Sequence, residues 1–132
     1  MNLILKAHDT IQTIQEHFSA IFPYLRLEFY HTKHQPGEAN VQADQYLHNV
    51  TLQTVTGSEQ DIEIAFHPEM KTKDLELLFE TQCKLYVQLM RKQSGTWLQT
   101  TRSDEQTLAQ QNQHGADMDA FKHTKQELDE AF

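Results

Sequence analysis

Two histidines three residues apart, His31 and His34 in "HTKHQPG", have a spacing that could contribute to a metal site. Zinc is held by three or four convergent ligands, of which this spacing supplies two. The same residues also fit the end of a strand that runs into a polar loop, where they would face water. We therefore keep a metal- or small-molecule-binding module centred on the His31/His34 loop as the alternative function, and we predict no cofactor.

Nucleophilic chemistry has little support in this sequence. Cys83 is the one cysteine, which excludes an internal disulfide, and it occupies a position typical of a helix core. A buried thiol reacts poorly because its thiolate is disfavoured there, so we expect Cys83 to be structural. No base can be assigned to it or to Ser103. We predict no catalytic residue, and an enzyme ranks third among the expected functions.

The elements that must position these residues are predicted by a pattern that occurs twice, in residues 2–31 and 61–92. When Phe18 is aligned with Phe79, both segments show apolar residues at helical spacing, followed at once by a strand-like alternation. A short apolar strand precedes each helix, so each segment reads strand–helix–strand. Pro23 ends the first helix. The second helix has no such stop, so we expect Lys84 to make the turn at positive φ.

The connector 32–60 is long for a compact domain and contains "TLQTV", for which we expect one helical turn or a short strand. After the second unit, Ser94-Gly95 predicts a hairpin turn. A return strand follows, and then a short helix that is opened by Ser103 and ends near Gly115. We therefore predict a single domain over residues 1–115 and a separate amphipathic helix over 116–132.

Two strand–helix–strand units of this kind predict an α+β fold, namely a ferredoxin-like sandwich with an added hairpin strand and C-terminal helices. The alternative is a ubiquitin-like β-grasp, in which a mixed sheet surrounds one helix.

The C-terminal segment carries an apolar stripe, and Trp97 is the only tryptophan. A lone helix of this length is marginal in water, so the stripe needs a surface to pack on. We expect that surface to belong to a second copy of the chain, or alternatively to the hairpin near Trp97. The predicted function is non-catalytic protein–protein interaction or self-association, with a homodimer suspected. The candidate interaction residues are Trp97, Met118, Phe121, Leu128 and Phe132.

The 132-residue chain has a formal net charge of −8 at pH 7. This charge repels phosphate groups, so we expect no nucleic acid and no anionic membrane surface among the partners. No stretch approaches the roughly 18 apolar residues of a membrane span. The beginning of the sequence is not typical of a signal peptide, and we expect a cytoplasmic protein.

The segment "WLQTTRSDEQTLAQQN", together with "FPYL", "EF" and "VQ" earlier in the chain, resembles a signature of short, acidic, uncharacterised bacterial proteins, many of them from Bacteroidetes. The resemblance covers most of residues 10–113 and implies a shared fold without implying an activity. The sequence departs from that pattern at Cys83-Lys84, where the family usually has an aromatic residue and glycine. The hairpin and the helix after it are also similar to the end of ubiquitin-like scaffold domains.

Overall fold

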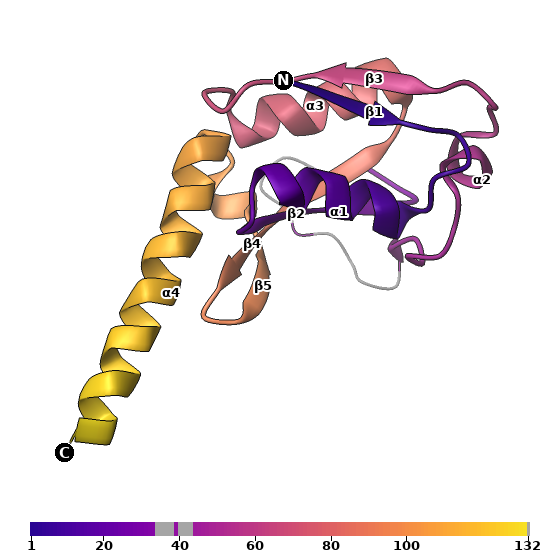
Figure 1. The fold of residues 1–132 in the computed structure, drawn as a ribbon. Helices are drawn as coiled ribbons and strands as arrows, with labels where there is room; N and C mark the ends of the chain where they lie inside the picture. The colour runs from indigo at the N-terminus through magenta and orange to yellow at the C-terminus, as the bar shows by residue number, and fades with distance from the viewer. Residues whose placement is uncertain (34–38, 40–43, 132) are drawn as a thin grey trace.

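The structure is a computed structural model that describes residues 1–33, 39 and 44–131, with side chains described up to residue 121 (Figure 1). Helices and strands are combined in an α+β fold, which confirms the predicted class. In the part of the chain that is described, no helix has both the length and the apolar character needed to cross a membrane. The elements in chain order are β1 (Asn2–Leu5), α1 (Ile11–Ile21), β2 (Leu25–Tyr30), α2 (Leu52–Thr56), β3 (Ile62–Ala65), α3 (Thr72–Cys83), β4 (Tyr86–Gln93), β5 (Thr96–Gln99), the 3₁₀ turn η2 (Thr101–Ser103) and α4 (Leu108–Ala131).

Both segments predicted to read strand–helix–strand do so, as β1–α1–β2 and β3–α3–β4. The aligned residues Phe18 and Phe79 are both fully buried, as the alignment requires. The predicted turn in "TLQTV" is the short helix α2. That the two units arose as a repeat stays a prediction.

The helix ends have local causes. The Thr10 hydroxyl accepts the Thr13 N–H at 3.2 Å and so satisfies one free donor at the start of α1. At the end of α3, Lys84 is left-handed with φ 54°, as predicted, and its N–H donates to the Glu80 carbonyl at 3.0 Å. This one residue turns the chain from α3 directly into β4.

The strands form two antiparallel sheets within the described residues. β1 pairs with β3, and the second sheet has the order β2–β4–β5. β2 pairs with β4 along its whole length, from Leu25 opposite Arg91 to Tyr30 opposite Tyr86. A ferredoxin-like sandwich would instead place β2 and β4 at opposite edges of one sheet. The pairing therefore does not confirm the ferredoxin-like arrangement, and the β-grasp alternative is not confirmed either.

One hydrophobic core joins these elements. In Figure 1 the β1–β3 sheet lies at the top. The helices α1 and α3 and the strands of the second sheet, β2, β4 and β5, lie below it. Apolar side chains from both sheets and both helices meet in a single cluster. Its aromatic members touch across elements, with Phe18 near Phe66 (ring centres 6.0 Å apart) and Phe29 edge-on to Phe79 (6.2 Å). Such offset or edge-to-face pairs add to the stability gained from burial.

The C-terminal part differs from the prediction at both ends of the expected short helix. Ser103 does not open the helix, because the carbonyls of Gln106 and Asp104 accept the first free N–H groups of α3, from Thr72 (2.8 Å) and Lys73 (2.9 Å). The helix α4 starts one turn later. There the Thr107 hydroxyl accepts the N–H of Gln110 at 3.1 Å and the Gln110 amide oxygen accepts the Thr107 N–H at 2.8 Å.

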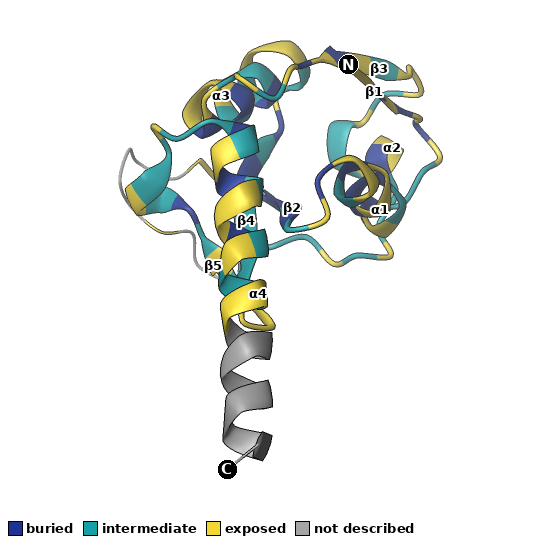
Figure 2. Ribbon diagram, turned by 60° about the vertical axis from the view of Figure 1, so that its left-hand side comes forward, coloured by how far each residue is buried: buried dark blue, intermediate teal, exposed yellow. Residues whose placement is uncertain are grey.

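The break predicted near Gly115 is also wrong, since α4 continues through this residue to Ala131. Glycine suits this position in the helix because Tyr24 and the backbone of Lys92 lie too close for a side chain. A Cβ at Gly115 would lie 2.7 Å from the Tyr24 Cβ and 2.8 Å from the Lys92 carbonyl oxygen. Tyr24 also donates its N–H to Asn112 at 2.9 Å. The first turns of α4 are thereby held against β2 and β4, and the helix then runs away from the other elements (Figures 1 and 2).

Candidate binding groove between α3 and β4

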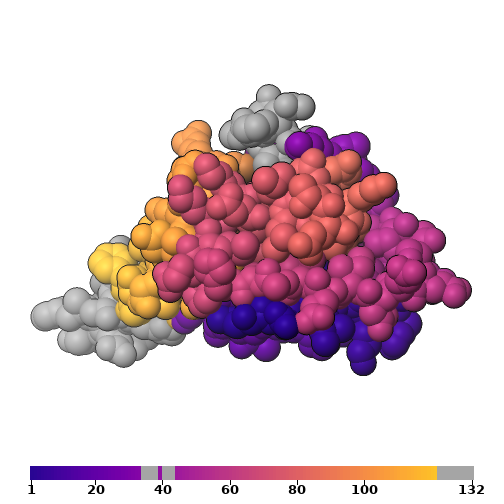
Figure 3. All heavy atoms as spheres, turned by 90° about the horizontal axis from the view of Figure 1, so that it is seen from above, coloured from indigo at the N-terminus to yellow at the C-terminus, as the bar shows by residue number. Residues whose placement is uncertain are grey.

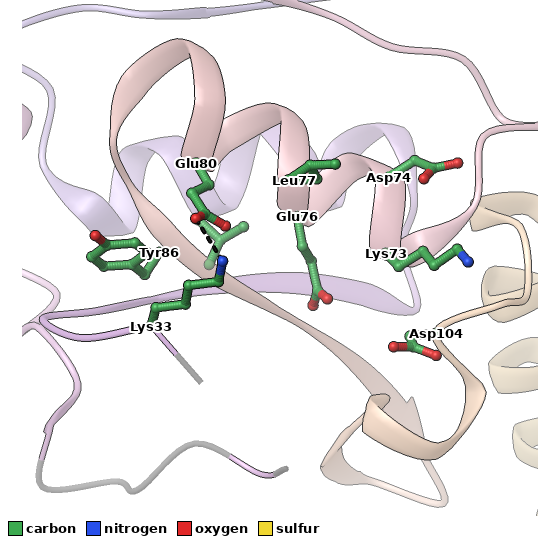
Figure 4. A pocket seen from close by; sticks show the side chains of 9 residues that line it. Lys33, Lys73, Asp74, Glu76, Leu77, Glu80, Tyr86 and Asp104 are labelled. Atoms are coloured by element: carbon green, nitrogen blue, oxygen red, sulfur yellow. Dashed lines mark ion pairs between the residues drawn. The ribbon is translucent and has the colours of Figure 1, made fainter. Parts of the chain in front are cut away.

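A groove lies beside α3, between this helix and β4 (Figure 4). Its volume is about 400 Å³, which is within the range of small-molecule sites. Most of the lining comes from one face of α3, and the rest comes from β4, from the segment after β2 and from the turn after η2. The lining residues are Lys33, Lys73, Asp74, Glu76, Leu77, Glu80, Tyr86, Val87 and Asp104.

Glu76 is a half-buried carboxyl group on the face of α3 that turns toward the core. It follows buried Thr72 by four residues and precedes buried Phe79 by three, so the helical period turns it inward. Figure 4 shows its side chain leaving α3 into the space between the helix and β4. Glu76 Oε2 accepts the backbone N–H of Leu89 at 2.9 Å. This contact ties the groove wall to the middle of β4.

Burial raises the pKa of Glu76 to about 7, because the charged form loses hydration. The hydrogen bond from Leu89 acts in the opposite direction, and the negative charge of Asp104 adds a smaller increase. Glu76 therefore gains and loses its proton near neutral pH, at the inner wall of the groove.

The lysines beside the groove have their own carboxylate partners. Lys33 pairs with Glu80 at 2.9 Å, and Lys73 pairs with Glu105 outside the groove lining. Asp74 and Asp104 have no ion pair with a described cation. The groove therefore carries an excess of negative charge whenever Glu76 is ionised.

The histidine pair predicted as a metal site is described only in part. His31 is exposed, and its ring lies against the Tyr46 ring with centres 3.7 Å apart. His34 lies outside the described residues, so the pair stays a prediction. Among the side chains that are described, no three His, Cys, Asp or Glu residues are grouped so that they could hold a metal ion. Lys33, from the same loop, lines the groove.

The candidate interaction residues are likewise only partly described. Trp97 is half-buried on β5, with the Arg26 guanidinium 5.8 Å from its ring centre, a cation–π contact. On α4, Met118 is half-buried and Phe121 is 65 % exposed. The side chain of Leu128 and all of Phe132 lie outside the described part of the chain.

Cys83 is half-buried rather than fully buried, and it packs at the margin of the core. Burial raises the pKa of its thiol to about 11. The thiolate is therefore scarce at neutral pH, which supports a structural role.

A second polar cluster surrounds Glu28, which is only 5 % exposed on β2. Its carboxylate accepts hydrogen bonds from Arg26 at 2.8 Å and from Gln45 at 2.6 Å, and His48 lies 3.3 Å away. These contacts hold the segment that contains Gln45 and His48 against β2. Sequence reasoning missed the cluster, because its members are distant in the chain.

Sequence reasoning also missed Glu76, although a signal was present. The apolar face of α3 is predicted from Leu75, Phe79 and Cys83, and a helix places Glu76 on that same face. A carboxyl group on an otherwise apolar helical face indicates an acid that is partly buried.

No protein-family model matches the chain, and neither the curated proteins nor the solved structures contain a match to it. The resemblance to a bacterial family of unknown activity stays a prediction.

Proposed function

We propose that the chain is a non-catalytic binding protein and that the groove between α3 and β4 takes a small aliphatic ammonium ion, such as a diamine. The observation that carries this proposal is Glu76, a half-buried carboxyl group with a raised pKa at the inner wall of an open groove of about 400 Å³.

The charges of the lining favour a cation. Once the pair Lys33–Glu80 is set aside as neutral, the carboxylates of Asp74, Glu76 and Asp104 remain, and none of them forms an ion pair with a described cation. A bound ammonium group would donate hydrogen bonds to these oxygens, and charge-assisted bonds of this kind are stronger than neutral ones. An anion would instead be repelled by the negative charge of the lining.

The apolar part of the lining favours an aliphatic chain. Leu77, Val87 and the ring of Tyr86 offer apolar surface between the charged groups. Methylene groups gain roughly 0.8 kcal/mol each when they are fully buried, so a chain with an ammonium group at its end would use both parts of the groove.

Glu76 by itself does not support catalysis. A carboxyl group whose pKa lies near 7 is suited to proton transfer, but acid–base catalysis also needs a reacting group held within reach. The described residues that line the groove supply no activated nucleophile beside Glu76.

Titration calorimetry with 1,4-diaminobutane tests this proposal. Binding should become about tenfold tighter between pH 6 and pH 8, because Glu76 ionises over this interval while alkyl ammonium groups stay charged. Glu76→Gln should abolish the pH dependence. Glu16→Gln, which removes a charge from an exposed position on α1, should bind like the wild type. Absence of binding, or equal affinity at both pH values, contradicts the proposal.

Self-association, the first function predicted from the sequence, is a second candidate. The observation that favours it is the gathering of exposed apolar side chains at one edge of the β1–β3 sheet, where Met1 and Ile4 are both 53 % exposed and Ile21 is 37 % exposed. Sedimentation of the full-length chain over a range of concentrations tests it, since a chain that stays at 15.4 kDa throughout does not self-associate.

A further inference from the structure

The outer edge of β1 carries backbone groups that have no partner among the described residues. Met1 and Phe66 exchange both backbone hydrogen bonds, at 2.9 and 2.8 Å, so they form a hydrogen-bonded pair of the β1–β3 ladder. Such pairs alternate along antiparallel strands, which means that the N–H and C=O groups of Asn2 and Ile4 point away from β3. An edge of this kind is a template for another strand.

The unpaired edge of β1 is short, because at its C-terminal end the backbone groups of Lys6 already have hydrogen-bond partners. Lys6 would be the next outward-facing residue, but its N–H donates to the Asp9 carboxylate at 3.2 Å and its C=O accepts the Asp9 N–H at 3.0 Å. Along β1, only the backbone groups of Asn2 and Ile4 therefore lack a partner among the residues that the structure describes. A partner strand must match this two-residue pattern.

The surface around the edge is apolar and nearly balanced in charge. A groove of about 440 Å³ runs between β1 and α1, and its lining includes Ile4, Ala20 and Ile21. Its charged residues, Lys6 and Asp9, have opposite signs. Figure 3 shows the first residues of the chain at the surface beside β3. A second copy is therefore not repelled here, although the whole chain carries a net charge of −8.

We propose that β1 pairs antiparallel with β1 of a second copy, around a twofold axis at Leu3, so that Asn2 lies opposite Ile4 of the other chain. This register satisfies all the free N–H and C=O groups of both residues in both copies. A register centred on Ile4 would require the backbone of Lys6, which Asp9 already occupies. The inference rests on the self-association candidate and names its surface.

Pairing of this kind has a physical advantage for the fold. The β1–β3 sheet has only two short strands among the described residues, so one of its two edges lies along β1. Joining two copies through β1 would produce one four-stranded sheet and would cover Met1 and Ile4 at the junction. The proposed partner is thus an identical strand, whose own unpaired N–H and C=O groups would be satisfied by the same pairing.

The test is the solution mass of the full-length chain over about a hundredfold range of concentration, because dimerisation follows mass action. The wild type should approach twice 15.4 kDa as concentration rises. Ile4→Lys should stay monomeric, since it places like charges together at the edge. Ile4→Pro should do the same, because it removes an outward N–H that the pairing with β3 does not use. Leu98→Lys, at an exposed position on β5, is the matched control and should dimerise like the wild type.

The possible results distinguish the pairing through β1 from self-association in general. A wild type that is monomeric at every concentration overturns self-association, and with it the pairing of β1. A dimer that survives both Ile4 variants, or that is lost on Leu98→Lys or Phe121→Lys instead, keeps self-association and overturns the β1 surface. Circular dichroism and thermal melting of each variant check that the fold is intact, and slower amide exchange at Ile4 in the dimer would support the register directly.

Discussion

Replacing Glu76 by glutamine should change how the stability of the protein depends on pH. The folded chain raises the pKa of this carboxyl group from the ordinary 4.5 to about 7, chiefly through burial. Between these two values the folded state holds a proton that the unfolded state has released. Stability is therefore fully present below about pH 4.5, falls as pH rises towards 7, and levels off above it.

The size of the effect follows from the two pKa values. A pKa unit corresponds to about 1.4 kcal/mol, so ionised Glu76 lowers the free energy of unfolding by about 3 kcal/mol at alkaline pH. Most of this loss falls between pH 5 and pH 8. Glutamine is neutral at every pH and keeps an oxygen that can accept the Leu89 N–H. The variant should lack this part of the pH dependence.

Urea unfolding at several pH values between 5 and 8, followed by circular dichroism, measures the effect. The stability of Glu76→Gln relative to the wild type should rise by about 2 to 3 kcal/mol over this interval. A constant penalty for an unpaired amide N–H would shift all points equally and would not alter the slope. The exposed change Glu16→Gln controls for net charge. A difference between Glu76→Gln and the wild type that is the same at pH 5 and pH 8 would refute the reasoning.

Three further changes test the structure away from the groove. Gly115→Ala should destabilise the protein by about 1–3 kcal/mol in urea unfolding, because the new methyl group meets Tyr24 and a backbone carbonyl; a gain in stability would show that the contact is not tight. Lys84→Gly should stabilise it by about 1 kcal/mol in the same assay, since glycine adopts the left-handed conformation without strain, and a loss would argue against that conformation. Cys83 should react with a thiol reagent at pH 8 about a hundredfold more slowly in the native than in the unfolded chain, because its pKa is raised from 9.0 to about 11; equal rates would contradict the burial.

Features that depend on neighbours in the chain were predictable from the sequence. The alternation of Leu25, Leu27 and Phe29 predicts the buried face of β2, and the missing stop after α3 predicts the positive φ of Lys84. Ser94-Gly95 likewise predicts the hairpin, in which both residues have positive φ. Each of these rests on the conformational preferences of a few adjacent residues.

The start of α4 shows where local reasoning fails. Ser103 and Thr107 are both suitable first caps for a helix, and the sequence does not distinguish them. The choice depends on α3, whose first N–H groups bind the carbonyls of Asp104 and Gln106 and keep this segment out of the helix. Gly115 is similar, because it reads as a helix stop and is instead the point where α4 approaches Tyr24.

The sequence by itself determined the α+β class and the elements from β1 to β5, because periodicity and turn chemistry act over a few residues. The tertiary structure alone decided that β2 pairs with β4, that Glu76 opens onto a groove and that the edge of β1 stays free. These properties depend on contacts between residues far apart in the chain. Burial then sets the protonation of Glu76, since the same carboxyl group would keep its ordinary pKa on an exposed helix.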